Sequence, residues 1–443
     1  MLQLLFRTSG WKDALIISLD GGGLDSGEPS SGGLFIAEDY EIERQELYGT
    51  EANFGVFYGA ITEALGWAYA DGEGKTMGLA PYGDASRAHR MLSEFIPTVV
   101  GTSLRSNKTV HCRFNICNGR FCVDFTDDPF FQAVQTLVSD VGRENVAAAA
   151  QKLLEDSLVS LVTNAVEQFG MRRICLSGGV FLNVKANKRI REALPSCELF
   201  IPPNPGDGGS ALGAALEACF METGTTPKSR MQTPYLGPEY STEQIEAELR
   251  RPSGRLEFSL SPDVAKEAAK LVANGAVIGW FQGRSEWGPR ALGNRSVIAL
   301  PNSKAVKDRI NNLLKQREWF LPFAPSIKEE EAPRYFRRFA ESPFMIMSFD
   351  ISPDREADLA GVIHVDRTVR PHTLSRDDNP RYYSLLSEVE SLTNIPAVLN
   401  TSFNKHGLPL VESPADAIQH LLWGCVDALV IDDFVAIRKK STV

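Results

Sequence analysis

The sequence has no long hydrophobic run, no excess of basic residues and no cysteine framework. No apolar stretch approaches the length of a bilayer span, and the opening MLQLLF is followed at once by Arg7 and Lys12, which argues against a signal sequence. The formal net charge of −10 disfavours a dedicated binder of nucleic acid or anionic membrane. Seven scattered cysteines, an odd number, favour a reducing compartment. We therefore expect a cytoplasmic protein with neither nucleic acid nor membrane as a partner.

One cluster of thiols superficially suggests a metal knuckle. Cys112, Cys117 and Cys122 lie close together in the chain, with His111 beside the first of them. Asn118-Gly119 is typical of a two-residue hairpin turn, and such a turn places Cys112 on the opposite face from the other two thiols. We therefore predict a plain hairpin here rather than a metal site.

The length of the chain predicts more than one domain. Its 443 residues exceed what a single hydrophobic core usually serves, although 43% apolar and 23% charged residues are ordinary for a globular protein. Residues 223–238 are rich in Gly, Thr and Pro and are interpreted as a linker. We expect one domain over residues 1–235 and a second over residues 236–443, with no fixed-period repeat.

In the first half, strands and helices are predicted to alternate. Residues 14–19 form a buried-strand run that ends in the glycine-rich turn 20–23, and residues 146–169 have the apolar spacing of a long helix that Gly170 stops. The expected order then continues with strand 173–176, turn 177–179, helix 184–191, strand 198–201, turn 206–209 and a helix from residue 211. This order predicts strands between helices, with ligands at the carboxyl ends of the strands.

A second alternation is predicted after the linker. Ser241 and Gln244 have the spacing of a capping box that starts a helix. The further predicted helices cover residues 263–272, 305–314, 381–392 and 415–423, and the predicted strands cover 276–281, 344–349, 397–399 and 428–431. The fold class expected for both halves is α/β.

Three glycine turns in the first half indicate a nucleotide site. They contain Asp20, Gly178 with Gly179, and Asp207 with Gly208, and each follows a predicted strand. Glycines at strand ends allow backbone amides to approach phosphate oxygens, and a following helix adds its positive N-terminus. Any one turn could simply connect two elements. Together, with two carboxylates that could hold a divalent cation, they resemble the nucleotide fold of actin, sugar kinases and heat-shock chaperone ATPases.

The second half contains residues suited to binding anions. Arg284, Arg290 and Arg295 lie in a stretch shaped by three glycines and a proline, and guanidinium groups in such loops suit bidentate capture of phosphate or carboxylate. Downstream stand two further pairs, one cationic and one neutral: Lys315 and Arg317, then Ser402 and Asn404. Either pair alone could be structural, but together they would supply point charge, a planar fork and neutral donors for a triphosphate.

At these residues the sequence resembles the carbamoyltransferase family that includes nodulation-factor and antibiotic O-carbamoyltransferases. The resemblance covers nearly the whole chain and is carried by residues 75–83 (KTMGLAPYG), 176–183 (LSGGVFLN), 206–213 (GDGGSALG), 288–296 (GPRALGNRS), 317–326 (REWFLPFAPS), 399–404 (LNTSFN) and 413–416 (SPAD). It implies that the first domain is a partial actin-like fold, similar to threonylcarbamoyl transferases. The second domain would form carbamoyl-adenylate and carry the K-x-R then S-x-N signature.

The resemblance also implies a reaction and its residues. Carbamoyl phosphate and ATP would give carbamoyl-adenylate, from which the carbamoyl group passes to a hydroxyl of a small-molecule or glycan acceptor. The implied catalytic residues are Lys315, Arg317, Arg290 and Arg295, and those binding nucleotide or carbamoyl phosphate are Arg284, Ser402, Asn404, Gly178, Gly179, Asn183 and Gly208. A divalent metal, Fe²⁺ or Mg²⁺, would be held partly by Asp20 and Asp207, and a homodimer is compatible with the sequence.

One departure from the family pattern concerns the metal. Family members carry a His-x-x-x-His motif before the segment that corresponds to residues 6–20, whereas the six histidines of this chain stand elsewhere and unpaired. We therefore expect an N-terminally truncated chain with an incomplete metal site and an impaired transfer step. The alternatives are a nucleotide-binding remnant without turnover and an ATP-dependent small-molecule kinase. A role in tRNA modification is disfavoured by the acidity of the chain.

Overall fold

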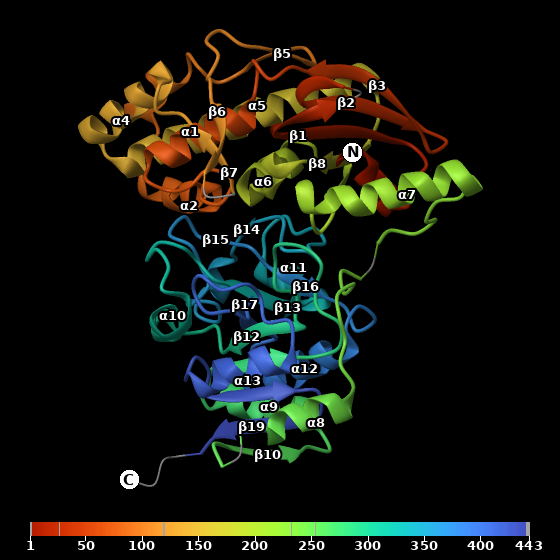
Figure 1. The fold of residues 1–443 in the computed structure, drawn as a ribbon, viewed down its shortest axis with the longest axis vertical. Coiled ribbons are helices and arrows are strands. Elements are labelled where there is room, and N and C mark those ends of the chain that lie inside the picture. The colour runs from red at the N-terminus through yellow and green to blue at the C-terminus, as the bar shows by residue number, and fades with distance from the viewer. Residues whose placement is uncertain (1, 26, 118–119, 232, 253, 440–443) are drawn as a thin grey trace. The chain divides into compact units, whose positions relative to one another are not determined.

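The computed structural model divides the chain into two compact units, Met1–Met231 and Gln232–Val443, which are called unit 1 and unit 2 below. It describes residues 2–25, 27–117, 120–231, 233–252 and 254–439. In Figure 1 the elements of unit 1 run from red to yellow-green, and those of unit 2 run from green to blue. The division falls inside the segment interpreted as a linker.

Unit 1 contains a five-stranded sheet with the order β3-β2-β1-β8-β9. The strands are β1 (Ala14–Asp25), β2 (Glu28–Glu38), β3 (Glu41–Tyr48), β8 (Arg173–Ser177) and β9 (Glu198–Phe200). The first three form an antiparallel meander, while β8 and β9 continue the sheet in parallel with β1. The predicted strands at 14–19, 173–176 and 198–201 are confirmed.

The prediction of a glycine-rich turn at residues 20–23 is wrong. β1 continues through this segment to Asp25 and stays paired with β2, with a register shift between Leu19 and Gly23. Gly22 has a φ of 147°, which a residue with a side chain rarely adopts. The glycines therefore permit an irregularity within a long hairpin rather than a reversal of the chain.

Helices pack around the sheet of unit 1. They are α1 (Phe54–Ala64), α2 (Glu73–Leu79), α3 (Ser86–Leu92), α4 (Pro129–Val141), α5 (Arg143–Phe169), α6 (Val184–Ala193) and α7 (Ser210–Thr223), with shorter 3₁₀ turns η1 (Leu2–Ser9), η2 (Ala80–Tyr82), η3 (Gly179–Leu182) and η4 (Asp207–Gly209). The long helix predicted at 146–169 is confirmed as α5. It ends at Gly170, whose φ of 69° satisfies the left-handed cap that glycine favours.

Two small ribbons complete unit 1. β4 (Thr98–Val100) pairs with β5 (Ser103–Arg105), and β6 (Arg113–Cys117) pairs antiparallel with β7 (Arg120–Asp124). Cys117 stands opposite Arg120, as a two-residue connection requires. The predicted turn at 118–119 itself, like the side chains of two of the three clustered cysteines, lies outside the described residues.

Unit 2 is built on an eight-stranded mixed sheet with the order β10-β19-β18-β11-β12-β17-β13-β16. The strands are β10 (Leu256–Leu260), β11 (Ile278–Phe281), β12 (Arg295–Ala299), β13 (Ala324–Lys328), β16 (His372–Leu374), β17 (Ala397–Ser402), β18 (Ala428–Ile431) and β19 (Phe434–Arg438). Only the pairs β11–β18 and β13–β16 are parallel. The strand predicted at 344–349 is wrong, since only β14 (Phe349–Asp350) forms there, paired with β15 (Thr368–Val369).

The helices of unit 2 are α8 (Thr242–Arg250), α9 (Val264–Ala273), α10 (Lys304–Ile310), α11 (Ala332–Tyr335), α12 (Pro380–Thr393) and α13 (Pro414–Leu422). The capping box of Ser241 and Gln244 is present. α9 and α12 bury their apolar faces with Trp280 of β11 and Val398 of β17 in one core. The α/β fold class is confirmed. In the described parts of both units, no helix is long and apolar enough to cross a membrane.

Candidate functional site

Three arginines converge on a small pocket of unit 2. The pocket has a volume of about 90 Å³, and Arg290, Arg317 and Arg370 line it. Arg290 comes from the connection between β11 and β12, Arg317 follows α10, and Arg370 follows β15. The other lining residues are Pro289, Ala291, Pro322, Phe323, Ala324, Met345, Asn400, Thr401 and Ser402. Segments far apart in the sequence thus bring three guanidinium groups to one place.

The arginine pocket has no counter-charge of its own. The three side chains are half-buried, the Nε of each has no hydrogen-bond partner, and within the described ranges no carboxylate forms an ion pair with any of them. Burial lowers the pKa of Arg290 to about 10, and burial with the charge of Arg290 lowers the pKa of Arg317 to about 10. Burial and both neighbouring charges also lower the pKa of Arg370. A bound anion would relieve this repulsion and restore the favoured charged state.

A second polar cluster adjoins the pocket at Ser402. The ammonium Nζ of Lys315 donates to the Oγ of Ser402 at 2.7 Å and to the Oδ1 of Asn404 at 2.6 Å. It also contacts the backbone oxygens of the same two residues, at 2.6 and 3.1 Å. Lys315, Ser402 and Asn404 therefore meet, and Ser402 is shared with the arginine pocket.

The turn between Lys315 and Arg317 explains why these two cations face different groups. A single turn of π-helix, η5 (Asn311–Lys315), ends at Lys315, and Gln316 then takes a left-handed φ of 42°. Lys315 is buried, and burial together with the charge of Arg317 lowers its pKa. Its three N–H groups already face four oxygen acceptors, but none of these carries a formal charge, so the ammonium has no counter-charge among these partners.

Arg295 does not reach the pocket. It is fully buried at the start of β12 and lies over the ring of Phe281, 3.5 Å from the centroid. Its guanidinium donates, at 2.7 to 3.3 Å, to the backbone oxygens of Gln282, Asn294, Gly283 and Pro238. Its Nη1 and Nη2 atoms hold the 282–294 connection in this way, while its Nε has no partner, and the expectation that Arg295 binds a second anion stays a prediction.

Arg284 is likewise placed away from the arginine pocket. Its side chain is exposed, and Nη2 donates to the backbone oxygen of Leu236 at 3.1 Å. It is not among the residues that line the pocket. The loop that was expected to offer three arginines to an anion thus offers one, Arg290.

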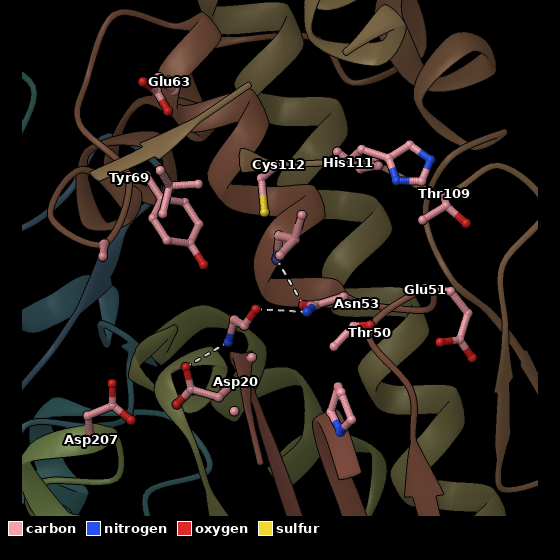
Figure 2. A pocket seen from close by; sticks show the side chains of 18 of the residues that line it. Asp20, Thr50, Glu51, Asn53, Glu63, Tyr69, Thr109, His111, Cys112 and Asp207 are labelled. Carbon is pink, nitrogen blue, oxygen red and sulfur yellow. Dashed lines mark hydrogen bonds between the residues drawn. The ribbon is translucent and has the colours of Figure 1, made fainter. Parts of the chain in front are cut away.

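Unit 1 contains a much larger cavity, of about 1200 Å³. Figure 2 shows Asp20 and Asp207 on one side of it, with the hydroxyl of Tyr69 pointing toward them and Cys112 and Glu63 farther along the wall. Asp20 is at the irregularity of β1, and Asp207 begins η4. The two expected metal carboxylates therefore do face one cavity.

Asp20 is held by backbone amides. Its Oδ1 accepts from the N–H of Gly21 and its Oδ2 from the N–H of Gly179, each at 2.6 Å. Burial raises the pKa of Asp20, which these hydrogen bonds oppose and the nearby charge of Asp207 reinforces. Burial raises the pKa of Glu63 in the same cavity.

The donor set of this cavity does not complete a metal site. Transition metals in proteins take three or more ligands, commonly with imidazole or thiolate among them. In the residues that the structure describes, no group of three or more His, Cys, Asp or Glu side chains could hold a metal ion. Both oxygens of Asp20 already accept backbone hydrogen bonds. The residues present thus do not fit the metal that the family resemblance implied.

The glycines of the second turn shape the backbone beside Asp20. Gly178 has a φ of 98°, and a Cβ on it would stand 1.9 Å from the backbone oxygen of Leu19. Gly179 donates its N–H to Asp20. The exposed Gly208 follows Asp207 in η4, where a Cβ would stand 2.5 Å from the Nδ2 of Asn204. Close approach of two chain segments, not a ligand, already accounts for Gly178.

Asn183 acts as a helix cap. Its Oδ1 accepts from the N–H of Ala186 at the start of α6, at 3.1 Å. Its side chain also forms a buried pair with the amide of Gln151 in α5, at 2.9 Å. These contacts join α5 and α6, and the expected role of Asn183 in nucleotide binding stays a prediction.

Sequence reasoning missed several lining residues. Arg370 stands in an irregular stretch without a glycine pattern, and only its neighbour Pro371 hints at a shaped backbone. In unit 1, His111 and Cys112 were dismissed with the thiol cluster, yet both line the cavity. Burial, aided by the charge of Asp128, raises the pKa of the Cys112 thiol, so this thiol is not activated as a nucleophile.

Comparisons with known proteins agree over most of the chain. The family model of the carbamoyltransferase N-terminus matches residues 6–216, and that of the carbamoyltransferase C-terminus matches residues 269–438. Nodulation protein NolO of Bradyrhizobium diazoefficiens is 35% identical, over 99% of this chain and 78% of the relative. Nodulation protein NolNO of Sinorhizobium fredii is 34% identical, over 98% of this chain and 62% of the relative.

A more distant relative and one solved structure extend the comparison. An uncharacterized protein of Methanocaldococcus jannaschii is 33% identical, over 97% of this chain and 70% of that protein. The crystal structure of full-length HypF in the phosphate- and nucleotide-bound form has a TM-score of 0.33 and 14% identity, over 50% of this chain and 42% of that chain. A likeness of that size carries no argument about ligands.

Proposed function

Because the chain belongs to the carbamoyltransferase family, we propose that unit 2 converts carbamoyl phosphate and ATP into carbamoyl-adenylate, and that unit 1 passes the carbamoyl group to an acceptor hydroxyl. The arginine pocket is the observation that carries this proposal. Three guanidinium groups without a counter-charge suit a small dianion, and a volume of about 90 Å³ fits an acyl phosphate rather than a nucleotide.

The atoms of the activation step balance with one water molecule. Water cleaves carbamoyl phosphate to carbamate and inorganic phosphate. A carbamate oxygen then attacks the α-phosphorus of ATP, which forms carbamoyl-adenylate and releases pyrophosphate. Both reactants are anions that repel each other, so the protein contributes mainly by neutralising charge and aligning them. Arg290, Arg317 and Arg370 hold the phosphate, and Lys315 with Ser402 binds the triphosphate beside it.

Transfer takes place in the cavity of unit 1. The acceptor hydroxyl attacks the carbamoyl carbon, AMP leaves, and the hydroxyl proton passes to a base. The cavity volume of about 1200 Å³ leaves room for an acceptor beside the adenylate, and Asp207 is an exposed carboxylate on its wall. The acceptor is a hydroxyl-bearing small molecule or glycan. Any metal that assists transfer needs ligands beyond Asp20 and Asp207.

Pyrophosphate exchange tests the activation step. The full chain is incubated with ATP, labelled pyrophosphate and carbamoyl phosphate, and label entering ATP is measured. We expect exchange that depends on carbamoyl phosphate and falls at least a hundredfold in Lys315→Met, because the buried ammonium can no longer meet the triphosphate. Lys266→Met, on an exposed face of α9, is the matched control and should exchange normally.

The same assay separates the alternatives raised by the sequence. Carbamoyl-phosphate-dependent exchange supports activation, whereas formation of ADP without exchange would favour a kinase. Tight binding of ATP with neither product would favour a nucleotide-binding remnant. Transfer is measured separately, as AMP release that depends on an added hydroxyl acceptor.

A further inference from the structure

One neutral side chain stands among the cations of the arginine pocket. Asn400 lies inside β17 and lines the pocket together with Arg290, Arg317 and Arg370. Its side chain is 1% exposed. A buried amide is costly unless both its donors and its acceptor are paired, so each atom of Asn400 requires an account.

The donor end of this amide is fully used. The Nδ2 of Asn400 donates to the backbone oxygen of Ala291 at 3.0 Å and to the Oγ of Ser326 at 2.8 Å. Exchanging the nitrogen and oxygen would set two oxygens against each other at Ala291, so the hydrogen bonds assign the orientation. The Oδ1 of Asn400 has no hydrogen-bond partner among the described residues.

A neighbouring histidine fixes the polarity of this arrangement. Ser326 of β13 lies opposite His372 of β16, and its Oγ is 2.9 Å from the Nδ1 of His372. The ring of His372 is buried, and burial lowers its pKa to about 3, so the ring is neutral. The single hydroxyl proton of Ser326 can then go to His372, which leaves the Ser326 oxygen to accept from Asn400. The Oδ1 of Asn400, a residue that lines the pocket, is thus left as a buried neutral acceptor without a partner among the described residues.

We propose that the Oδ1 of Asn400 accepts an N–H of the carbamoyl amide and so selects carbamoyl phosphate against other acyl phosphates. This inference rests on the proposed function of unit 2. Arginines offer only donors, and they bind the phosphate of any acyl phosphate equally well. Acetyl phosphate has nearly the same shape but carries a methyl group where carbamoyl phosphate carries NH₂. A methyl group would leave the buried acceptor unpaired, which is the kind of mismatch that gives strong discrimination.

Two stable analogues make the test direct. Phosphonoacetamide keeps the amide and the phosphonate, acetonylphosphonate replaces the NH₂ by methyl, and inorganic phosphate reports on the arginines alone. Calorimetric titration of the full chain should show phosphonoacetamide binding at least tenfold more tightly than acetonylphosphonate. In Asn400→Leu the two affinities should become equal, while phosphate binding is retained. Equal affinities in the unsubstituted protein, or a preference that survives in Asn400→Leu, would overturn the inference.

A second variant covers the case in which Asn400→Leu does not fold. Ser326→Ala keeps the acceptor but removes the bond that orients it, and should reduce the preference severalfold without weakening phosphate binding. An unchanged preference would contradict the role given to the Ser326 hydroxyl in orienting the amide of Asn400. Failure of the proposed function is seen differently: if neither analogue nor phosphate binds, the arginine pocket is not an anion site, and the selectivity argument falls with it. If all three bind alike, only the role of Asn400 is lost.

Discussion

The arginine pocket of unit 2 and the cavity of unit 1 differ in both size and charge. The first is small and lined by three guanidinium groups without carboxylates. The second is more than ten times larger, and Asp20, Glu51, Glu63 and Asp207 line it, with no lysine or arginine among its described lining residues. A small pocket lined by three guanidinium groups can be selective for one anion. A roomy, acidic cavity can admit a larger and more variable polar molecule.

The largest expected effect concerns the backbone under the acidic cavity. Gly178→Ala should lower the free energy of unfolding of unit 1 by about 3 kcal/mol or more, because both the positive φ and the contact with Leu19 oppose a Cβ. Gly170→Ala is the control: its φ is 69° but its surroundings are open, so a cost of about 1 kcal/mol is expected. Urea denaturation measures both. Equal costs would show that the close approach at Gly178 is not rigid.

The next largest effect is on anion binding, when one positive charge is removed from the arginine pocket. Arg370→Gln should weaken binding of phosphonoacetamide about a hundredfold, because it removes one of the three guanidinium groups that supply all the positive charge lining this pocket. Arg334→Gln, which alters an exposed arginine paired with Glu331, should change nothing. Calorimetric titration gives both values. A loss below threefold would remove Arg370 from the site.

Acidification should lower the stability of unit 2 and raise that of unit 1. The larger of these two changes comes from His372 in unit 2. Its folded pKa of about 3 lies below its ordinary value of 6.5, so the unfolded chain binds the proton more tightly. Stability of unit 2 is therefore present above about pH 6.5 and lost as pH falls toward 3, by about 2 kcal/mol at pH 5. Hydrogen exchange of the β16 peptide, corrected for intrinsic rates, measures this loss. His372→Gln should flatten the profile, and an equal slope in both proteins would exclude the histidine as its cause.

The smallest expected effect is a gain in the stability of unit 1 on acidification, caused by Asp20. Burial raises the pKa of Asp20 above 3.8, so the folded state binds the proton more tightly. Its contribution to stability is complete below that value and is lost as pH rises through the folded pKa. After correction for the intrinsic exchange rates, protection of the β8 peptide should therefore be higher at pH 4.5 than at pH 6.5, and this difference should be smaller in Asp20→Asn. An opposite trend in the unsubstituted protein would show that the amides of Gly21 and Gly179 outweigh burial.

Sequence patterns predicted elements well where periodicity and caps agreed. α5, with its repeating apolar positions and its final Gly170, was predicted nearly to its ends, and so was the capping box before α8. Residues 344–349 show where such reasoning fails. An apolar run indicates burial but not conformation, and Met345 there is buried with a φ of 55°, which no strand accommodates.

The candidate site was partly predictable for the same reason. Lys315, Ser402 and Asn404 could be grouped from motifs, and they do lie together. Arg295 and Arg370 could not be sorted from the sequence, because the two arginines differ only in what surrounds them. Carbonyl oxygens surround Arg295, whereas Arg370 faces other cations. That distinction depends on tertiary neighbours and leaves no local pattern.

The left-handed conformation of Gln316 has a consequence for how far this segment tolerates change in length. One residue of reversed handedness sends Lys315 toward the hydroxyl of Ser402 and Arg317 toward the other two guanidinium groups. Inserting or deleting a single residue between Lys315 and Arg317 would rotate one of these two cations out of place, whichever residue is inserted or deleted. The spacing of Lys315 and Arg317 is therefore as strict a requirement as their charge.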